Sequence, residues 1–291
     1  MNDDFFSWRR MKNNDKEIIP VQEMLRDLED DYAFAAARFL SRNPSKDPIW
    51  TLKDRKGGLS TLIINSKSTV LPVFYGKKDM PFPKFLSGFF QLKRIHSIQG
   101  LTEEVLFIED VLKRLGRKVS DTFDYELMSL DKFIFNSELR RTEAGIIPAL
   151  VLRVPRMTDL DALAPLQASY EHEEVMHRGS VFSPAASRVN LSNIVVGGNI
   201  LAAEINGCLV GKINVSGVSF TRYLVGGVFV RQDCRSRGIA GKMAAQFIST
   251  LIKDGMGVTL FVKKSNIAAR KLYTRLGFKV IRDYRITYFY D

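Results

Sequence analysis

The segment that most limits the possible folds of this chain is residues 228–242, with the sequence VFVRQDCRSRGIAGK. An apolar run typical of a β-strand leads into a basic loop that contains Arg235 and Arg237, and Gly238 precedes a helix predicted over residues 239–255. The first amides of a helix have no partner inside the helix and lie at the positive end of its dipole, so they attract anions. Glycine lets such a loop approach a phosphate group closely. The segment therefore predicts either an anion-binding turn between a strand and a helix or a surface turn that is basic by chance.

A second segment, residues 260–278, has the sequence LFVKKSNIAARKLYTRLGF. It predicts another strand followed by a helix, because the apolar run ends near an Asn that can cap a helix and the next residues have helical apolar spacing. Asn266 stands at the predicted start of this helix and Tyr273 near its end. Taken alone, Tyr273 is more typical of a packed aromatic side chain than of a catalytic one.

Both segments resemble the motifs of one enzyme family. Residues 235–240, Arg-Ser-Arg-Gly-Ile-Ala, match the (Gln/Arg)-x-x-Gly-x-(Gly/Ala) signature of the GNAT superfamily, the Gcn5-related N-acetyltransferases, at the strand-to-helix junction where that family has it. Residues 260–278 look like the family's next motif, and the resemblance covers the chain from about Ala149 to Asp291. It implies an acyl-CoA-dependent N-acyltransferase. In the simplest case the enzyme transfers an acetyl group from acetyl-CoA to a primary amine by direct attack in a ternary complex.

The resemblance also implies which residues bind the cofactor. The backbone of Val228, Phe229 and Val230 is expected to hydrogen-bond the pantetheine arm as if it were an added strand. The preceding pair Gly226-Gly227 suits a bulge that bends this strand away from the next one. The loop amides are expected to hold the pyrophosphate, and the residues concerned are Arg235, Ser236, Arg237, Gly238, Ile239, Ala240, Gly241 and Lys242.

The same resemblance implies the catalytic residues. It puts Asn266 beside the cofactor and Tyr273 near its sulfur, as the acid for the leaving thiolate; because a phenol has an unperturbed pKa near 10, hydrogen bonding is expected to matter more than full proton transfer. The candidate bases are Glu173 and Glu174, which crowd a predicted helix end together with Glu171. Mutual repulsion there would raise a carboxyl pKa. The alternative interpretation is a solvated acidic helix end, or one that attracts a cationic amine.

Length and element order predict two domains of similar design. The chain has 291 residues, against about 150 for a usual domain, and both halves have the order of helix, antiparallel strands, helix, strand, helix and strand. Residues 1–145 are predicted to be a degenerate GNAT-like domain without a CoA phosphate loop, since the Arg-x-x-Gly-x-Ala pattern is absent between Phe74 and Gln99. Residues 146–291 are predicted to be a GNAT acetyltransferase domain.

The predicted fold class is α/β (α+β). It consists of two tandem GNAT-like domains, each with a mixed, mostly antiparallel twisted sheet flanked by helices, and a splayed strand pair holds acyl-CoA in the second. Three elements have clear local signals: a helix over residues 21–40, a two-residue hairpin at Asn206-Gly207 and a final pair of strands within residues 278–290.

Composition excludes several classes of protein and partner. A content of 45% hydrophobic and 26% charged residues is typical of globular proteins and excludes disordered, collagen-like and coiled-coil chains. No apolar run of about 18 residues or signal peptide is visible, so we expect a cytoplasmic protein without a membrane partner. Two cysteines and three histidines make neither a disulfide framework nor a His-based metal site, so no metal is expected. The formal charge of +11 favours an anionic partner such as a phosphorylated cofactor.

Two other functions also fit the sequence. An aminoacyl-tRNA-dependent transferase of the tandem-GNAT type would suit the basic second half, although the intact loop argues against it and nucleic acid is not an expected partner. A non-catalytic CoA-binding sensor would need no base.

For the leading function, the acceptor is left open among small amines, amino acids, antibiotics, peptide N-termini and lysine side chains, because a fold-level resemblance does not specify a substrate. Acyl-chain preference and oligomeric state are left open too.

Overall fold

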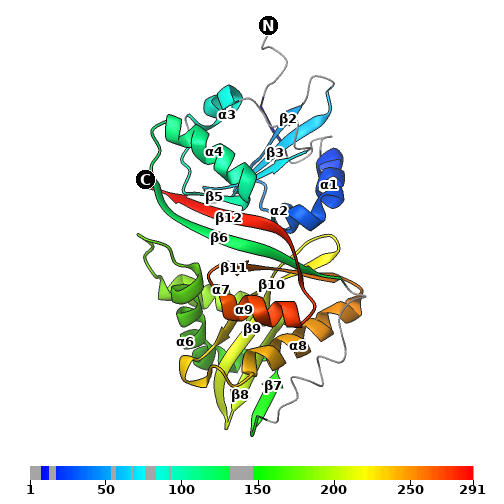
Figure 1. Ribbon diagram of the computed structural model, residues 1–291, viewed down its shortest axis with the longest axis vertical. Helices are drawn as coiled ribbons and strands as arrows, with labels where there is room; N and C mark the ends of the chain where they lie inside the picture. Colours follow the sequence, from blue (N-terminus) through cyan, green and yellow to red (C-terminus); the bar gives the residue numbers. More distant parts are fainter. Residues whose placement is uncertain are drawn as a thin grey trace. The chain divides into compact units, whose positions relative to one another are not determined.

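The structure, a computed structural model, describes residues 8–12, 18–53, 57–66, 68–75, 83–91, 93–131 and 147–290. The chain divides into two compact units, and most of their helices and strands are labelled in Figure 1. Unit 1 consists of Met1–Leu127, Lys263–Ser265 and Val280–Asp291, and unit 2 of Met128–Val262 and Asn266–Lys279. The predicted boundary between residues 145 and 146 lies outside the described residues.

Unit 1 is built on a mixed, mostly antiparallel sheet. Its elements are β1 (Arg9–Arg10), α1 (Ile18–Asp27), α2 (Glu29–Leu40), β2 (Ile49–Lys53), β3 (Leu59–Ser66), β4 (Thr69–Phe74), α3 (Pro83–Phe90), β5 (Ser97–Leu101), α4 (Thr102–Arg114), β6 (Val119–Leu130) and β12 (Lys279–Phe289). Strands β1 to β4 pair with their sequence neighbours in antiparallel fashion, whereas β4 and β5 are parallel. A parallel pair needs a crossover, which α3 supplies.

The strand β12 completes the sheet of unit 1. It is a single strand that lies between β5 and β6 and pairs antiparallel with all five residues of β5. The predicted pair of strands within residues 278–290 is therefore wrong. This segment has no Gly or Pro at which the chain could turn back, and its alternating pattern is that of one long strand.

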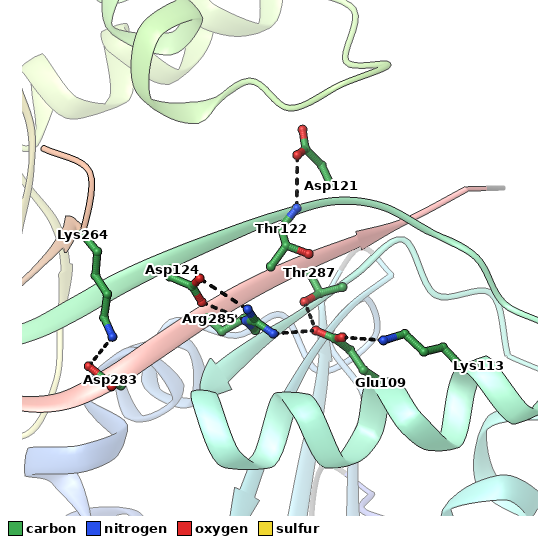
Figure 2. A network of polar contacts seen from close by, with 9 residues as sticks. All are labelled: Glu109, Lys113, Asp121, Thr122, Asp124, Lys264, Asp283, Arg285 and Thr287. Carbon is green, nitrogen blue, oxygen red and sulfur yellow. Dashed lines mark hydrogen bonds and ion pairs between the residues drawn. The ribbon is translucent and has the colours of Figure 1, made fainter.

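Polar side chains fix β12 to its neighbours in unit 1 (Figure 2). Arg285 of β12 donates to both carboxylate oxygens of Asp124 on β6, with the shorter contact 2.8 Å from Nε to Oδ1, and its Nη1 lies 3.6 Å from Oε1 of Glu109 on α4. The hydroxyl of Thr287 donates to the same oxygen of Glu109. Glu109 is buried, so two side chains of β12 satisfy an acid that would be costly to bury alone.

Unit 2 is built on five neighbouring strands in the order β11-β10-β9-β8-β7. Its elements are β7 (Leu150–Arg153), α6 (Leu160–Tyr170), a π-helical turn (Glu171–Val175), α7 (Pro184–Val196), β8 (Ile200–Ile205), β9 (Cys208–Val218), β10 (Arg222–Val230), α8 (Ile239–Leu251), β11 (Gly257–Lys263) and α9 (Ile267–Arg275). Neighbouring strands are antiparallel except for β10 and β11, which α8 connects as a parallel pair.

The helices of unit 2 cover both faces of its sheet. Leu163 of α6 and Leu191 of α7 pack with Ala202 of β8, while Met243 of α8 and Leu272 of α9 belong to the cluster on the other face. Adjacent residues of a strand point to opposite faces, and accordingly the residue after Ala202 joins the second cluster. Lys212 and Asn214 of β9, which are discussed below, lie on the side that faces α6.

The predicted fold class is confirmed, and besides the final strand pair two local elements differ from the prediction. The hairpin at Asn206-Gly207 is confirmed, and both residues have positive φ, 50° and 78°, as a type I′ turn requires. The predicted helix over residues 21–40 is two helices, α1 and α2. Helix α7 was not predicted, although Ser183 caps it by accepting a hydrogen bond from the amide of Ala186. In the part of the chain that the structure describes, no helix has the length and apolar character needed to cross a membrane.

Candidate active site

Strands β10 and β11 separate at the middle of β10. Their parallel pairing runs from Arg222 with Gly257 to Val225 with Leu260 and goes no further, although both strands continue. On the other side of β10, the register with β9 shifts between Gly226 and Phe229. The predicted bulge and the splayed strand pair are therefore confirmed.

Gly227 is the residue that makes this bulge possible. Its φ is +60°, and a Cβ atom on it would lie 1.9 Å from Oδ1 of Asn214 on β9. Real Cβ atoms do not approach that closely, and side chains other than glycine rarely adopt this backbone conformation. The opening between β10 and β11 thus depends on glycine at position 227.

The loop after β10 leads to the exposed N-terminus of α8. Ser236 and Gly238 both have positive φ, 62° and 78°, and Gly238 caps α8 without offering a side-chain acceptor. The backbone bond from the amide of Lys242 to the carbonyl of Gly238 starts the helix. The amides of Ile239, Ala240 and Gly241 have no partner within it. A Cβ atom on Gly238 would meet no other atom within 4 Å, so the space beside this residue at the start of the helix is open.

Arg235 organises this loop rather than pointing away from it. Its Nε donates to the carbonyl of Val230 at 2.9 Å, and its guanidinium carbon lies 5.2 Å from the centroid of the Phe229 ring. Its Nη2 donates to both carboxylate oxygens of Glu173, at 3.0 and 2.8 Å. The carboxylate of Glu173 is therefore held by Arg235 of this loop. Arg237 donates to the carbonyl of Asp233 at 3.0 Å, also within the loop.

Asn266 links the start of α9 to the π-helical turn after α6. Its Oδ1 accepts from the amide of Ala269 at 3.1 Å, which makes it the predicted helix cap. Its Nδ2 donates to Oε1 of Glu174 at 3.4 Å. The structure thus brings together two residues, Asn266 and Glu174, that are 92 positions apart in the sequence.

Tyr273 is buried in α9, with 6% of its surface exposed. Its ring packs edge-on against Phe278, with the centroids 5.6 Å apart. Burial raises the pKa of the Tyr273 phenol, and the neighbouring charges of Tyr170 and Glu174 raise it further. The phenol therefore keeps its proton at neutral pH and can act as a hydrogen-bond donor.

A cavity of about 300 Å³ lies within unit 2, beside the bulge. Helix α6 and the π-helical turn form one wall, α7 a second, and β9 with the bulge a third. The residues that line it are Gln167, Tyr170, Glu171, Val175, Asn190, Ile194, Asn214, Val215, Ser216 and Gly227. Of the three glutamates considered from the sequence, Glu171 is the one that lines this cavity.

Lys212 of β9 lies directly behind the cavity and was missed in the sequence. It has no exposed surface, and its Nζ donates to the carbonyl of Gly227 at 2.9 Å and to Oδ1 of Asn214 at 3.2 Å. Nζ also lies 4.7 Å from the centroid of the Tyr170 ring. Burial lowers the pKa of Lys212 to about 7, against a smaller opposite effect of Glu171. A lysine within the apolar run CLVGKINVS was the signal that could have identified it.

Two other titratable groups of unit 2 have ordinary structural partners. Glu204 of β8 accepts from Nε of Arg153 at 2.7 Å. The His172 ring packs against Phe182, with the centroids 4.6 Å apart. Over the described ranges, no group of three or more His, Cys, Asp or Glu side chains is arranged to hold a metal ion.

Comparison with known proteins identifies one family. Residues 167–278 match the model of the family described as "Acetyltransferase (GNAT) family". No curated protein matches the chain.

Several solved structures share the fold over nearly the whole chain. A tandem GNAT protein from the clavulanic acid biosynthesis pathway gives a TM-score of 0.62 at 11% identity, covering 97% of each chain. A GCN5-related N-acetyltransferase from Sphaerobacter thermophilus gives 0.61 at 14% identity, covering 98% of this chain and 95% of that one. An acetyltransferase from the GNAT family of Colwellia psychrerythraea gives 0.56 at 11% identity, covering 98% and 100%. At these identities the likeness concerns the fold alone.

Proposed function

We propose that this chain, whose residues 167–278 form a domain of the acetyltransferase (GNAT) family, transfers an acetyl group from acetyl-CoA to a primary amine. The observation that carries the proposal is the open N-terminus of α8 at Gly238. It lies one loop after the part of β10 that no longer pairs with β11. A long ligand with a pyrophosphate at one end and an extended amide arm at the other would match this succession of an anion site and an unpaired strand edge.

The residues present fit such a ligand. The amides from Ser236 to Gly241 would hold the pyrophosphate, because those of Arg235 and Lys242 already donate to the carbonyls of Gln232 and Gly238. Gly238 has open space beside it. The backbone of Val228, Phe229 and Val230 would pair with the pantetheine arm on the side where β10 has parted from β11. Asn266 would lie beside the same arm.

The side chains divide the chemical tasks between two sides of the site. Acetyl-CoA, when bound, supplies the acyl thioester whose C–S bond is exchanged for the new amide bond. Tyr273 holds a proton on the sulfur side, because burial raises its pKa. Glu174, oriented by Asn266, and Glu171, in the cavity wall, offer carboxylates that can take the proton the amine loses before it attacks. Glu173 serves as a positioning residue for Arg235.

The two units are proposed to have different roles. The phosphate-loop pattern occurs in residues 146–291, and the first 145 residues lack it between Phe74 and Gln99. We therefore assign cofactor binding to unit 2, with residues 1–145 as a degenerate copy of the same fold.

Calorimetric titration with acetyl-CoA tests the proposal. Micromolar binding by the wild-type protein is expected, which corresponds to about −8 kcal/mol. Gly238→Asp should weaken binding at least tenfold by putting a negative charge before the amides, while Gly238→Asn, of the same size and uncharged, should weaken it far less, because Asn tolerates positive φ. No binding by the folded wild-type protein, or equal losses in both variants, would contradict the proposal.

A further inference from the structure

Strand β4 of unit 1 leaves its parallel partner β5, as β10 leaves β11 in unit 2. The pairing of β4 with β5 ends at Val70 and Ile98. Strand β4 nevertheless continues to Phe74, and β5 continues to Leu101. Unit 1 therefore has a stretch of strand edge of its own beyond the last paired residues.

Phe74 directs its backbone groups to this edge. The backbone groups of successive strand residues point alternately to the two neighbouring strands. The amide of Tyr75, directly after β4, donates to the carbonyl of Ser60 on β3. The groups of Pro72 and Phe74 therefore point to the opposite side, from which β5 has parted. Since proline has no N–H, Phe74 is the residue whose amide and carbonyl both need partners there.

Two side chains of unit 1 take up the backbone groups of Phe74. The amide of Phe74 donates to the carboxyl group of Glu104 on α4. The hydroxyl of Tyr32 on α2 lies 3.4 Å from the carbonyl oxygen of Phe74 and is hydrogen-bonded to Oε1 of Glu104. Both groups of Phe74 are thus occupied from within the protein, which closes this edge of β4 to an added strand.

The contacts of Tyr32 fit a protonated Glu104. A phenol has one hydrogen, but the Tyr32 hydroxyl has two acceptor oxygens beside it, on Glu104 and on Phe74. If Glu104 carries a proton, it donates to Tyr32 and Tyr32 donates to Phe74, so both contacts are hydrogen bonds at once. An ionised Glu104 would compete with the Phe74 carbonyl for a single hydrogen.

The surroundings of Glu104 also disfavour a negative charge. Glu104 is 5% exposed, and its Oε2 is buried without a hydrogen-bond partner in the part of the chain that the structure describes. An ionised carboxylate is costly in such a place. Burial raises the pKa of this carboxyl to about 8, against the opposing effect of its two hydrogen bonds.

The groups around Glu104 supply no cation to compensate a charge. Within the described ranges, the titratable groups that face it, or that lie next to one that does, are Asp31 and Tyr32 of α2, Glu103 of α4, Tyr284 of β12 and Tyr125 of β6. The guanidinium of Arg282 on β12 is paired with Asp31 at 3.0 Å.

We infer that Tyr32 and Glu104 form a pH-sensitive latch on β4 of unit 1, closed while Glu104 holds its proton and released when the proton is lost. Release would leave the N–H and C=O of Phe74 unpaired on a strand edge, where another strand can add. The inference concerns unit 1 alone and does not depend on acetyl transfer by unit 2.

The sign of the pH dependence follows from the two states of the latch. In the open state Glu104 is in water, with the usual pKa of 4.5, whereas in the closed state it is about 8. Between these values the closed state binds one proton more. The equilibrium constant for opening should therefore rise with pH, by up to about tenfold per pH unit, and become level above pH 8.

Hydrogen exchange at the Phe74 amide tests the latch. Glu104→Gln has nearly the same size and stays neutral, so it should keep the latch closed at every pH. The exchange rate of the wild type divided by that of the variant, taken at the same pH, cancels the intrinsic pH dependence of exchange. This ratio should grow by at least about tenfold between pH 5 and 8. Glu23→Gln, on an exposed position of α1, is the control and should follow the wild type.

Infrared spectra test the proton directly, because the C=O stretching bands of a protonated carboxyl and a carboxylate are separate. At pH 6.5 the spectrum of the wild type minus that of Glu104→Gln should contain the band of one protonated carboxyl, which should fade near pH 8. Tyr32→Phe, which removes the acceptor of the proton, should shift this band in the otherwise unchanged chain.

Three results would overturn the inference. They are the absence of a protonated-carboxyl band in the wild type at pH 6.5, a band that Tyr32→Phe does not shift, and an exchange ratio that stays constant between pH 5 and 8. The infrared measurements on the wild type and Tyr32→Phe remain decisive even if Glu104→Gln does not fold.

Discussion

The side-chain nitrogen of Lys212 donates a hydrogen bond across 2.9 Å to the carbonyl oxygen of Gly227, from a position without solvent exposure. The two residues belong to neighbouring strands, and Gly227 is the centre of the bulge that opens the sheet. The peptide group that accepts this bond also carries the amide of Val228, one of the residues proposed to hold the pantetheine arm. A buried basic group therefore fixes the backbone on which the cofactor would lie.

The burial of Lys212 predicts a pH dependence of stability. Its pKa is about 7 in the folded protein and near the usual 10.5 in the unfolded chain. Between these values the unfolded state binds more protons, so this group makes the free energy of unfolding rise with pH, by up to about 1.4 kcal/mol per pH unit. Lys212→Met should lack that contribution. Urea unfolding of both proteins at pH 7, 8.5 and 10 should give a difference in favour of the wild type that grows with pH; parallel curves would refute the assignment.

Gly227→Ala is expected to be severely destabilising. The added methyl carbon would lie 1.9 Å from Oδ1 of Asn214, and the φ of +60° would be strained in addition. Gly255→Ala is the control, since its φ is +77° and no atom lies within 4 Å of the added carbon. The control should lose about 1 kcal/mol, the cost of the backbone conformation, and Gly227→Ala at least 2 kcal/mol more. Similar losses in chemical denaturation would show that the bulge tolerates a side chain.

Glu173→Gln distinguishes a positioning residue from a base. Both carboxylate oxygens of Glu173 accept from Arg235, and Glu173 is not among the residues that line the cavity, so it is not placed to take a proton from an amine there. The variant should keep the pH profile of kcat/KM and change the Kd for acetyl-CoA by less than about threefold, the range expected when a surface ion pair is lost. A loss of more than tenfold in kcat/KM together with a flattened acid limb would restore Glu173 as the base that the sequence indicated.

The anchoring of β12 can be tested within unit 1. Arg285→Gln removes the ion pairs to Asp124 and to the buried Glu109, and should lower the free energy of unfolding by about 2 kcal/mol. Arg282→Gln makes the same change on the same strand, where the partner is Asp31 and the arginine is half exposed. It should cost less than about 1 kcal/mol. If the two variants lose the same free energy of unfolding in urea, the ion pair with the buried Glu109 contributes no more stability than the exposed pair with Asp31.

Local signals made the loop before α8 and the start of α9 predictable from sequence, whereas contacts between distant segments were not predictable. Gly238 and Asn266 act on their own neighbours in the chain, as a helix start and a helix cap, so their roles follow from adjacent residues. The engagement of Glu173 depends on Arg235, 62 positions away. No property of the acidic turn itself distinguishes Glu173 from Glu171 or Glu174.

The residues around the cavity also depend on contacts between distant segments, which the sequence does not reveal. Lys212 and Asn214 face α6 because β9 pairs in one particular register with β8 and β10, and that register is a property of the whole sheet. Helix α7 could have been found from Ser183 and Pro184, a cap followed by a residue favoured at the first helical position.

The position of β12 also determines the order in which the two units can complete their folding during synthesis. A ribosome makes the chain from its N-terminus, and domains usually fold as they emerge. Unit 1 cannot follow that rule, because the strand that lies between β5 and β6 is synthesised after the whole of unit 2. Until then, β5 and β6 keep uncompleted edges of the kind that pair with wrong partners. The half of the molecule that is made first is therefore the half that is completed last, and nascent chains stalled before β12 should depend on chaperones.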